Sequence, residues 1–417
     1  MSGLLIIGAS YAGVQAALTA RDAGYSQPIT MVCDEDWLPY QRPPLSKDFL
    51  LGRTSEQNLV LRDNAFFENK QIELVLGHRA VGLDLGTRRV TLERGNDLAF
   101  DQLVFATGSR ARRIAIPGAD LDGVCYLRSA SDAIELKARL AAAAEIVIVG
   151  GGFIGLEVAA SAAKLGKKAT VVEASSRLLE RAVSPIVSDF LLDTHLQAGV
   201  DIRLNEVVAS FEGASPRVTG VVLDSGVNIR ADLVLVGIGG IANDELARTA
   251  GLNCTNGIVV DEHGRSAMPD IFAAGDCANH FNRFCESWIR LESVQNAQDQ
   301  AKAAGLAIAG SQGPYESVPR FWSDQYDVKL QIVGLAGKYD RKAVRGSVDA
   351  GKFSVFYYRD DRLVAVDSIN RPGDQMAARR LIARGVSPSP EQAEDPSFDL
   401  KSLVTGGDKA GVLPPDL

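Results

Sequence analysis

The chain contains one glycine-rich pattern twice. Residues 4–34 and 146–173 each read as an apolar run, a glycine loop, an alanine-rich stretch ending at glycine, and a β-branched run ending in an acid. One constant offset of 142 residues relates the glycines, which pair as Gly8 with Gly150, Gly13 with Gly155 and Gly24 with Gly166. Each copy therefore predicts a strand–helix–strand (βαβ) unit, and the fold must accommodate two of them.

Each predicted unit has the features of a dinucleotide-binding loop. Glycines permit positive φ and let the backbone approach a pyrophosphate, and the N–H groups of the following helix hold phosphates. The acids that end the second runs, Asp34 and Glu173, are placed to accept hydrogen bonds from ribose hydroxyls. One such loop also marks an ordinary strand–helix turn, but two complete copies favour two dinucleotide sites.

The two loops are not identical. The second has the full glycine fingerprint, whereas the first has Ser10 at the middle position. Ser10 raises the alternative of a hydrolase nucleophile elbow, but the closing glycine of G-x-S-x-G is absent. Glu173 would repel a 2′-phosphate and favours NADH over NADPH, although Arg177 and Arg181 weaken that inference.

Composition excludes several classes of protein. A chain of 417 residues with 46% hydrophobic residues predicts a soluble globular enzyme of two or three domains. A net charge of −8 argues against nucleic-acid binding. Five isolated cysteines fit a reducing compartment, four histidines without ligand spacing predict no metal, and no stretch suits a membrane helix. Residues 4–20 lack the basic flank of a signal peptide, so we expect a cytoplasmic protein.

Further strands end in glycine-containing turns. The stretch 105–108 (FATG) follows an apolar run, and 234–239 (VLVGIG) is a third buried strand. The stretch 271–276 (IFAAGD) predicts a strand followed by a helix that starts at Asp276, which as an isolated motif favours a simple helix N-cap.

Taken together, these residues resemble a known family. The carrying stretches are 39–47 (PYQRPPLSK), 106–108, 150–157, 275–276, 292–298 (ESVQNAQ) and 321–325 (FWSDQ). They resemble the two-dinucleotide flavoprotein reductases related to glutathione reductase. Within that superfamily the chain resembles the ferredoxin (redoxin) reductases of bacterial oxygenase systems, the group of putidaredoxin reductase and of the biphenyl dioxygenase ferredoxin reductase. The resemblance covers residues 3–403.

The resemblance implies an α/β architecture with two Rossmann-like domains. The FAD-binding domain would comprise residues 1–108 and 238–316, split by an inserted NADH-binding domain at 109–237. A C-terminal α/β interface domain would span 317–403, followed by a flexible tail at 404–417.

The resemblance also implies the site residues. For FAD these are Gly8, Ser10, Ala12, Gly13, Asp34, Arg42, Lys47, Val81, Ala106, Thr107, Gly108, Arg128, Gly275, Asp276, Glu292, Val294 and Trp322. For NADH they are Gly150, Gly151, Gly152, Ile154, Gly155, Glu157, Glu173 and Gly239. Lys47 and Glu157 are the implied catalytic residues and are expected to pair beside the flavin N5. Where the family has a proline before Asn243, this chain has Ala242, which puts the local loop shape in doubt.

The cysteines decide the expected mechanism. Glutathione-reductase relatives use a C-x-x-x-x-C pair beside the flavin, and the stretch 43–47 contains no cysteine. Cys277 is better explained as buried packing than as a nucleophile. We therefore expect FAD to take hydride from NADH and to pass single electrons to a [2Fe–2S] ferredoxin that serves a cytochrome P450 or a ring-hydroxylating dioxygenase.

Charge supports a protein acceptor. Residues 317–384 carry 13 Lys and Arg against 8 Asp and Glu, a net of +5. The presumed docking patch includes Arg371, Arg379, Arg380 and Arg384, near one expected helix, and acidic ferredoxins would be steered to it. A solvated helix face is the alternative. We expect a monomer or a weak dimer.

Two other functions compete. An NADH oxidase or diaphorase of the same fold would use oxygen or quinone as acceptor. A flavin-bound signalling protein resembling apoptosis-inducing factor would share the 39–47 motif, but that protein has a basic surface and a targeting segment.

Overall fold

A computed structural model describes residues 2–214 and 216–405 of the chain. The chain divides into two compact units. The first contains the residues up to Ser176 together with His195–Glu316, and the second contains Arg177–Thr194 together with the chain from Ser317 onward. Of the expected C-terminal tail, residues 406–417 lie outside the described residues.

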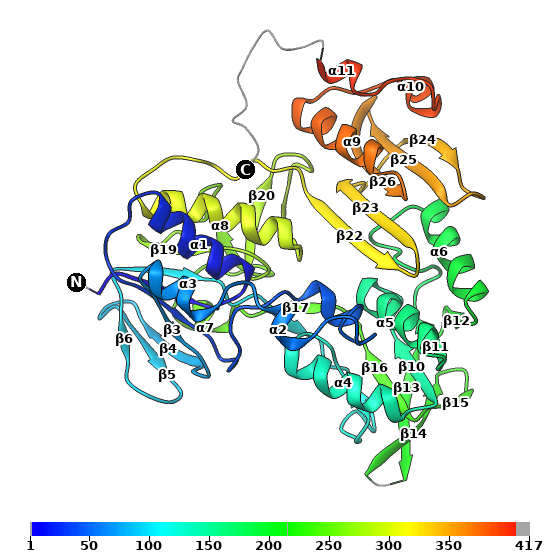
Figure 1. Ribbon diagram of the computed structural model, residues 1–417, viewed down its shortest axis with the longest axis horizontal. Coiled ribbons are helices and arrows are strands. Elements are labelled where there is room, and N and C mark those ends of the chain that lie inside the picture. Colours follow the sequence, from blue (N-terminus) through cyan, green and yellow to red (C-terminus); the bar gives the residue numbers. More distant parts are fainter. Residues whose placement is uncertain (1, 215, 406–417) are drawn as a thin grey trace. The chain divides into compact units, whose positions relative to one another are not determined.

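The first unit contains a five-stranded parallel sheet built on the first βαβ copy. Its order is β19-β7-β1-β2-β3, with β1 Leu4–Ile7, β2 Ile29–Val32, β3 Ile72–Val75, β7 Gln102–Phe105 and β19 Ile271–Ala273. Helix α1 (Tyr11–Asp22) connects β1 to β2 and packs along α8 (Val294–Ile308) (Figure 1). The two helices approach closely at Gly305, where a Cβ would lie 2.8 Å from the carbonyl oxygen of Ala16.

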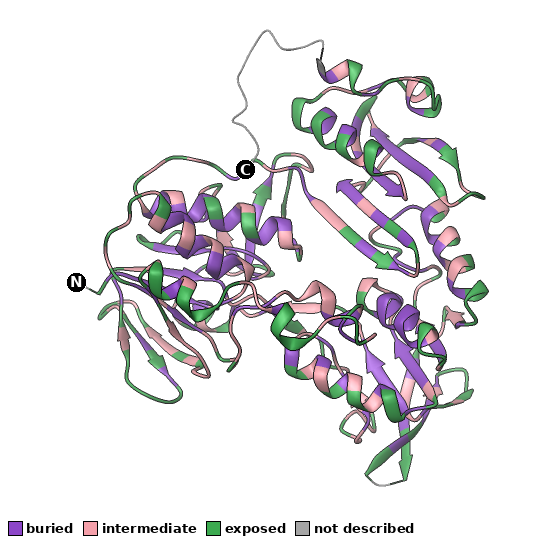
Figure 2. Cartoon of the chain, in the orientation of Figure 1, coloured by how far each residue is buried: buried purple, intermediate pink, exposed green. Residues whose placement is uncertain are grey.

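The same unit contains a second parallel sheet built on the second copy. Its order is β12-β11-β10-β16-β9, with β9 Val124–Cys125, β10 Glu145–Val149, β11 Lys168–Glu173, β12 Asp201–Leu204 and β16 Leu233–Val236. Helix α5 (Phe153–Lys164) connects β10 to β11, and α4 (Ala130–Ala142) precedes β10. The interiors of both sheets are buried (Figure 2). The two predicted βαβ units are therefore confirmed, as is the α/β fold.

Smaller elements complete the first unit. The antiparallel sheet β4-β5-β6 has strands Ala80–Asp84, Arg89–Leu92 and Leu98–Ala99, and β13-β14-β15 has Val208–Ala214, Arg217–Leu223 and Asn228–Arg230. The sheet β18-β20-β21 has Ile258–Val260, Ala278–Asn282 and Ser287–Ile289, and the pair β8-β17 has Ser109–Ala111 and Gly240–Ala242. The short helices are the 3₁₀ helix η1 (Pro43–Ser46), α2 (Glu56–Leu59), α3 (Asn64–Asn69) and α7 (Glu245–Thr249).

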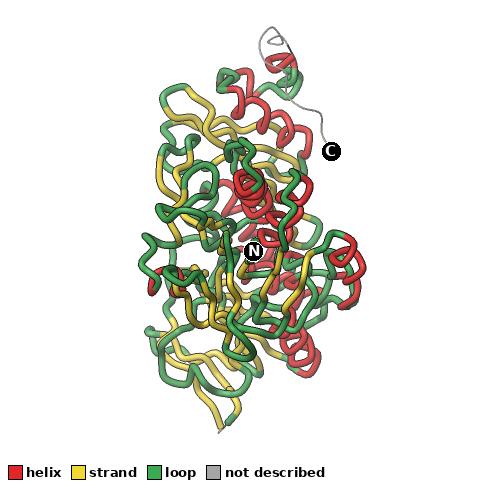
Figure 3. Tube along the Cα trace, turned by 90° about the vertical axis from the view of Figure 1, so that its left-hand side faces the viewer, coloured by secondary structure: helices red, strands yellow, loops and turns green. Residues whose placement is uncertain are grey.

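The second unit is built on an antiparallel sheet of order β22-β23-β26-β25-β24. The strands are Arg320–Gln325, Val328–Gly334, Arg362–Ile369, Lys352–Arg359 and Arg341–Ser347. Helix α9 (Pro372–Arg384) packs on β23 and β26 (Figure 1), and the short helices α10 (Pro390–Glu394) and α11 (Ser402–Thr405) follow it. Figure 3 shows the helices of the chain in red and its strands in yellow.

The segment Arg177–Thr194, which carries most of helix α6 (Pro185–Gln197), belongs to this second unit. The hydroxyl of Ser184 donates to the phenol oxygen of Tyr357 at 2.8 Å, and the rings of Phe190 and Phe353 meet edge to face at 5.3 Å. Nothing in the sequence indicated that this segment would pack with the C-terminal sheet.

Candidate active site

The two glycine loops repeat one backbone design. Gly8 and Gly150 have φ of +111° and +108°, and a Cβ would lie 2.1 Å from the Ala106 carbonyl oxygen at Gly8 and 2.5 Å from the Gly237 carbonyl oxygen at Gly150. Gly13 and Gly155 lie against the first glycine of their own loops. A Cβ at Gly13 would lie 1.9 Å from the carbonyl oxygen of Gly8, and a Cβ at Gly155 would lie 2.2 Å from that of Gly150. Side chains are thus excluded at both positions of each loop, because neighbouring strand ends and helix starts meet there.

The helices that follow the loops begin without a side-chain cap. The N-cap residues Ser10 and Gly152 make no capping hydrogen bond, whereas Ser129 caps α4 and Ser293 caps α8. Uncapped N–H groups at the N-terminus of a long helix are free to bind an anion, and the helix dipole favours one. Both loops therefore present a phosphate-binding backbone.

The second loop also has open space around it. A Cβ added at Gly152 would meet no atom within 4 Å, and Ile154 is 40% exposed in the first turn of α5. Glu173, at the end of β11, accepts hydrogen bonds from the backbone N–H groups of Gly151 at 2.6 Å and Ser175 at 2.7 Å. The carboxylate is thereby held beside the loop.

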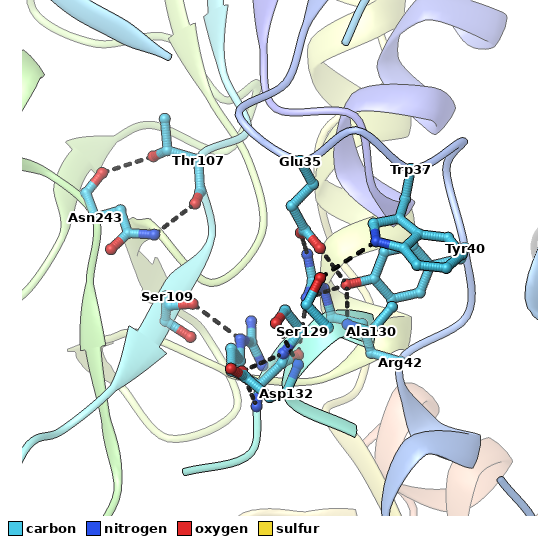
Figure 4. A network of polar contacts seen from close by, with 12 residues as sticks. Glu35, Trp37, Tyr40, Arg42, Thr107, Ser109, Ser129, Ala130, Asp132 and Asn243 are labelled. Atoms are coloured by element: carbon cyan, nitrogen blue, oxygen red, sulfur yellow. Dashed lines mark hydrogen bonds and ion pairs between the residues drawn. The ribbon is translucent and has the colours of Figure 1, made fainter. Parts of the chain in front are cut away.

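A polar network surrounds Tyr40 (Figure 4). Its hydroxyl donates to Glu35 at 2.6 Å and accepts from Arg42 and from the backbone N–H of Ala130, each at 2.9 Å. Arg42 also pairs with Glu35 at 2.6 Å and donates to the Arg128 carbonyl at 2.8 Å. Burial raises the pKa of Tyr40, so it remains a neutral donor. The network fixes the stretch 35–42 against the start of α4.

Sequence reasoning named Arg42 but missed Glu35 and Tyr40. Tyr40 stands in the quoted motif at 39–47, which was a usable signal, but its partner Ala130 lies 90 residues away in the chain. Trp37 extends the same contact by donating to Ser131 at 3.3 Å.

Arg128 and Asp276 form an ion pair at 2.6 Å. Ser109 donates to the same Asp276 oxygen at 3.2 Å and its carbonyl accepts from Arg128 at 2.8 Å. The prediction that Asp276 starts a helix was wrong, because the chain makes a turn there and continues as strand β20. The carboxylate caps no helix and instead holds the Arg128 guanidinium.

The loop that carries Ala242 has a regular structure. Ala242 ends strand β17 and pairs with Ser109 in the antiparallel β8–β17 ladder. The next residue, Asn243, exchanges two hydrogen bonds with Thr107, at 2.6 and 2.9 Å. These bonds tie the 106–108 turn to the loop after Gly239, so the missing proline leaves the loop shape defined.

Lys47 and Glu157 form a buried ion pair. Lys47 Nζ lies 3.1 Å from Glu157 Oε1, and the two side chains are 15% and 7% exposed. Lys47 follows η1, and Glu157 lies in α5, so the pair joins the stretch after the first βαβ unit to the helix of the second. The expected pairing of these two residues is confirmed.

Four further predicted residues lie outside the loops and ion pairs described above. Glu292 contacts Gly240, where a Cβ would lie 2.5 Å from its carboxylate, and Val294 begins α8. Val81, on β4, is 51% exposed. Trp322, on β22, belongs to the second unit and is 40% exposed.

Four of the five cysteines are poorly suited to redox chemistry. All five lie in the described part of the chain and are free thiols. Cys277 is fully buried, as expected, and burial raises its pKa. Burial also raises the pKa of Cys33, and it raises those of Cys125 and Cys254 to about 11. These four thiols are therefore protonated at neutral pH and weakly reactive.

In residues 2–214 and 216–405, no helix combines the length and the apolar character needed to span a bilayer.

Comparison with known proteins identifies the family. The model of the pyridine nucleotide-disulphide oxidoreductase family matches residues 2–301, and a model for the C-terminal domain of reductases matches residues 320–404. The chain belongs to the pyridine nucleotide-disulphide oxidoreductase family. It is an oxidoreductase that uses FAD and NAD(P)H, and the two uncapped glycine loops fit two dinucleotides.

Within this family the chain belongs with the ferredoxin reductases of oxygenase systems. It is 45% identical to rhodocoxin reductase of Rhodococcus erythropolis over 401 residues, which cover 96% of this chain and 94% of that protein. The crystal structure of the ferredoxin reductase for the CYP199A2 system of Rhodopseudomonas palustris has a TM-score of 0.94 and 40% identity, covering 97% of this chain and all of that one. The putidaredoxin reductase of the covalent putidaredoxin reductase–putidaredoxin complex has a TM-score of 0.94 and 38% identity, covering 98% and 99%.

Proposed function

We propose that this chain takes reducing equivalents from NADH and passes single electrons to a [2Fe–2S] ferredoxin of a bacterial oxygenase system. The observation that carries the proposal is that the stretch 43–47 contributes a buried cation, Lys47, to the site and contains no cysteine. Bound FAD would supply the two-electron to one-electron chemistry. The chain's own residues bind, orient and exclude water around it.

The two loops receive different nucleotides. The first loop and the residues after it would hold FAD, because Arg42 and Lys47 follow that loop. Its proposed residues are Gly8, Ser10, Ala12, Gly13, Asp34, Val81, the turn 106–108, Arg128, Gly275, Asp276, Glu292 and Val294. The second loop would hold NADH through Gly150, Gly151, Gly152, Ile154, Gly155, Glu173 and Gly239. The corresponding domains would be 1–108 with 238–316, 109–237, and 317–403.

Glu173 supports a preference for NADH. Its carboxylate is held next to the second loop by two backbone N–H groups. A 2′-phosphate at the ribose would meet this negative charge at close range, whereas a 2′-hydroxyl can donate to it. Arg177, one of the two arginines that the sequence offers to offset the charge, donates to the carbonyl groups of Val183 and Glu180.

Lys47 and Glu157 are the proposed catalytic residues. A cation fixed beside the point where hydride arrives stabilises the negative charge that develops there. Glu157 keeps Lys47 in one position, because a buried ammonium without a partner would turn toward water. The pair thus orients a charge in a site from which water is largely excluded.

Helix α9 supports docking of an acidic ferredoxin. Its exposed residues Met376, Arg379, Arg380 and Arg384 recur at helical spacing on one face. Arg371 contributes less, because it is paired with Asp374. A basic face that begins with an exposed methionine offers long-range attraction and an apolar contact beside it. We further propose that the enzyme is a monomer or a weak dimer. We propose a cytoplasmic location, because the free cysteines fit a reducing compartment.

Steady-state assays of the FAD-loaded protein test the proposal. The protein is mixed with NADH or NADPH and with a panel of [2Fe–2S] ferredoxins. Turnover that rises with added ferredoxin and is faster with NADH is expected. Turnover that is insensitive to every ferredoxin but scales with oxygen would favour an NADH oxidase instead.

A further inference from the structure

The carboxylate of Glu157 has a second partner besides Lys47. The hydroxyl of Ser46 donates to Oε2 of Glu157 at 2.5 Å, while Lys47 lies 3.1 Å from Oε1. The two carboxylate oxygens are therefore held by two consecutive residues of the chain. A carboxylate held through both oxygens cannot rotate without losing one of the two contacts.

The hydroxyl of a second serine, Ser161, binds the backbone of Ser46. Ser161, one helical turn after Glu157 in α5, donates to the backbone carbonyl of Ser46 at 2.9 Å. Helix α5 thus contacts η1 through both an acceptor, Glu157, and a donor, Ser161. These two bonds set the distance and the rotation of η1 against one face of α5.

The whole cluster is buried. Ser46 is 5% exposed, Glu157 6% and Ser161 3%. In such surroundings water does not readily replace a lost donor, and a carboxylate oxygen without one is strongly disfavoured. Removal of the Ser46 hydroxyl would leave Oε2 to compete with Oε1 for Lys47, which would draw the ammonium away from its present position.

We propose that Ser46 is a positioning residue for the Lys47–Glu157 pair, and that Ser161 supports it by holding η1 against α5. This inference rests on the proposed function, because it assumes that the pair acts in hydride transfer. In this inference Ser46 acts through its bond to Glu157. Its loss should therefore slow hydride transfer without weakening the binding of FAD or NADH.

Single-turnover reduction by NADH tests this inference in the FAD-loaded protein. The limiting rate of flavin bleaching should fall about tenfold in Ser46→Ala, the effect of losing one hydrogen bond to a charged group. The dependence of that rate on NADH concentration and the FAD content should be unchanged. Ser188→Ala is the matched control, since Ser188 is 1% exposed and donates to the Leu178 carbonyl within the second unit.

A double-mutant cycle separates positioning from general stabilisation. In a Glu157→Ala background the Ser46 hydroxyl has lost its acceptor, so adding Ser46→Ala should change the rate by less than about twofold. A full tenfold loss in that background, or a wild-type rate in Ser46→Ala alone, would overturn the inference. If the wild-type protein itself is not bleached by NADH, the proposed function fails instead.

Discussion

Lys47 Nζ lies 3.1 Å from Glu157 Oε1, and this contact joins residues that stand 110 positions apart in the chain. Each residue is placed by a different βαβ copy, Lys47 by the stretch that follows the first and Glu157 by the helix of the second. A buried pair of this kind is weak evidence for stability, because desolvation offsets much of its attraction. Its position, between the stretch after the first βαβ copy and the helix of the second, is the reason for the catalytic role that we propose.

Replacement of Lys47 should therefore slow the reduction of the flavin by NADH. In Lys47→Met the limiting rate of flavin bleaching by NADH should fall at least about tenfold, because the site loses an oriented positive charge. Stopped-flow spectroscopy measures this rate. Lys168→Met is the control, since Lys168 pairs with Glu145 while 71% exposed. Equal rates in Lys47→Met and wild type would exclude Lys47 as a catalytic residue.

Glu173 should set the choice of nucleotide. In Glu173→Ala the ratio of kcat/KM for NADH to that for NADPH should fall by about tenfold or more, because repulsion of the 2′-phosphate disappears. Steady-state kinetics with both nucleotides measure the ratio. A proportional loss with both nucleotides would show that Glu173 supports the loop through Gly151 and does not discriminate.

The arginines of α9 should steer the acceptor. In Arg379→Ala/Arg380→Ala, kcat/KM for ferredoxin should fall several-fold at low ionic strength and converge on wild type as salt is added, because exposed charges are screened. Arg362→Ala, an exposed arginine on β26, is the control. An acceptor rate that is independent of salt in the wild-type protein would reject α9 as a docking face.

Asp367 should make the second unit less stable as the pH rises from about 4 to 7. Burial raises its pKa to about 7 from an ordinary value of 3.8. The folded state thus holds a proton that the unfolded state releases, so stability falls as pH rises from about 4 to 7 and the loss is complete above 7. Tyr357 donates to Asp367, which keeps one oxygen engaged throughout.

Thermal unfolding at pH 6 and pH 8 measures this effect. The wild-type melting temperature of the second unit should drop between the two values, and Asp367→Asn should drop less, because its amide does not ionise. The same drop in both proteins would mean that other groups cause the dependence.

The sequence predicted the repeated part of the molecule well. A βαβ unit is local, so its strand, loop and helix can be read from glycine spacing and apolar periodicity at 4–34 and 146–173. A side chain at these glycines is excluded by contacts within the same βαβ unit or with the end of the neighbouring parallel strand. The pairing of Lys47 with Glu157 came from the family resemblance, not from periodicity.

Two kinds of feature were not predicted correctly from the sequence. One is contacts between residues far apart in the chain, and the other is local motifs that fit two different structures. Asp276 follows a strand and a glycine, a pattern that is typical of a helix start. Instead the chain turns there and continues as β20, and the carboxylate of Asp276 forms an ion pair with Arg128. The Tyr40–Ala130 bond and the packing of Ser184 on Tyr357 depend on how separate elements meet. Such contacts produce no periodic pattern of residues in the sequence, so they could not be predicted from it.

The central claim is that electrons pass from NADH to a ferredoxin through flavin without a thiol relay. The most direct measurement follows both half-reactions anaerobically, by flavin absorbance, in protein whose accessible thiols are alkylated. We predict that NADH bleaches the flavin, and that oxidised [2Fe–2S] ferredoxin restores it while twice as many ferredoxin molecules are reduced as NADH is consumed. Failure of ferredoxin to restore the absorbance, or loss of either half-reaction on alkylation, would contradict the account.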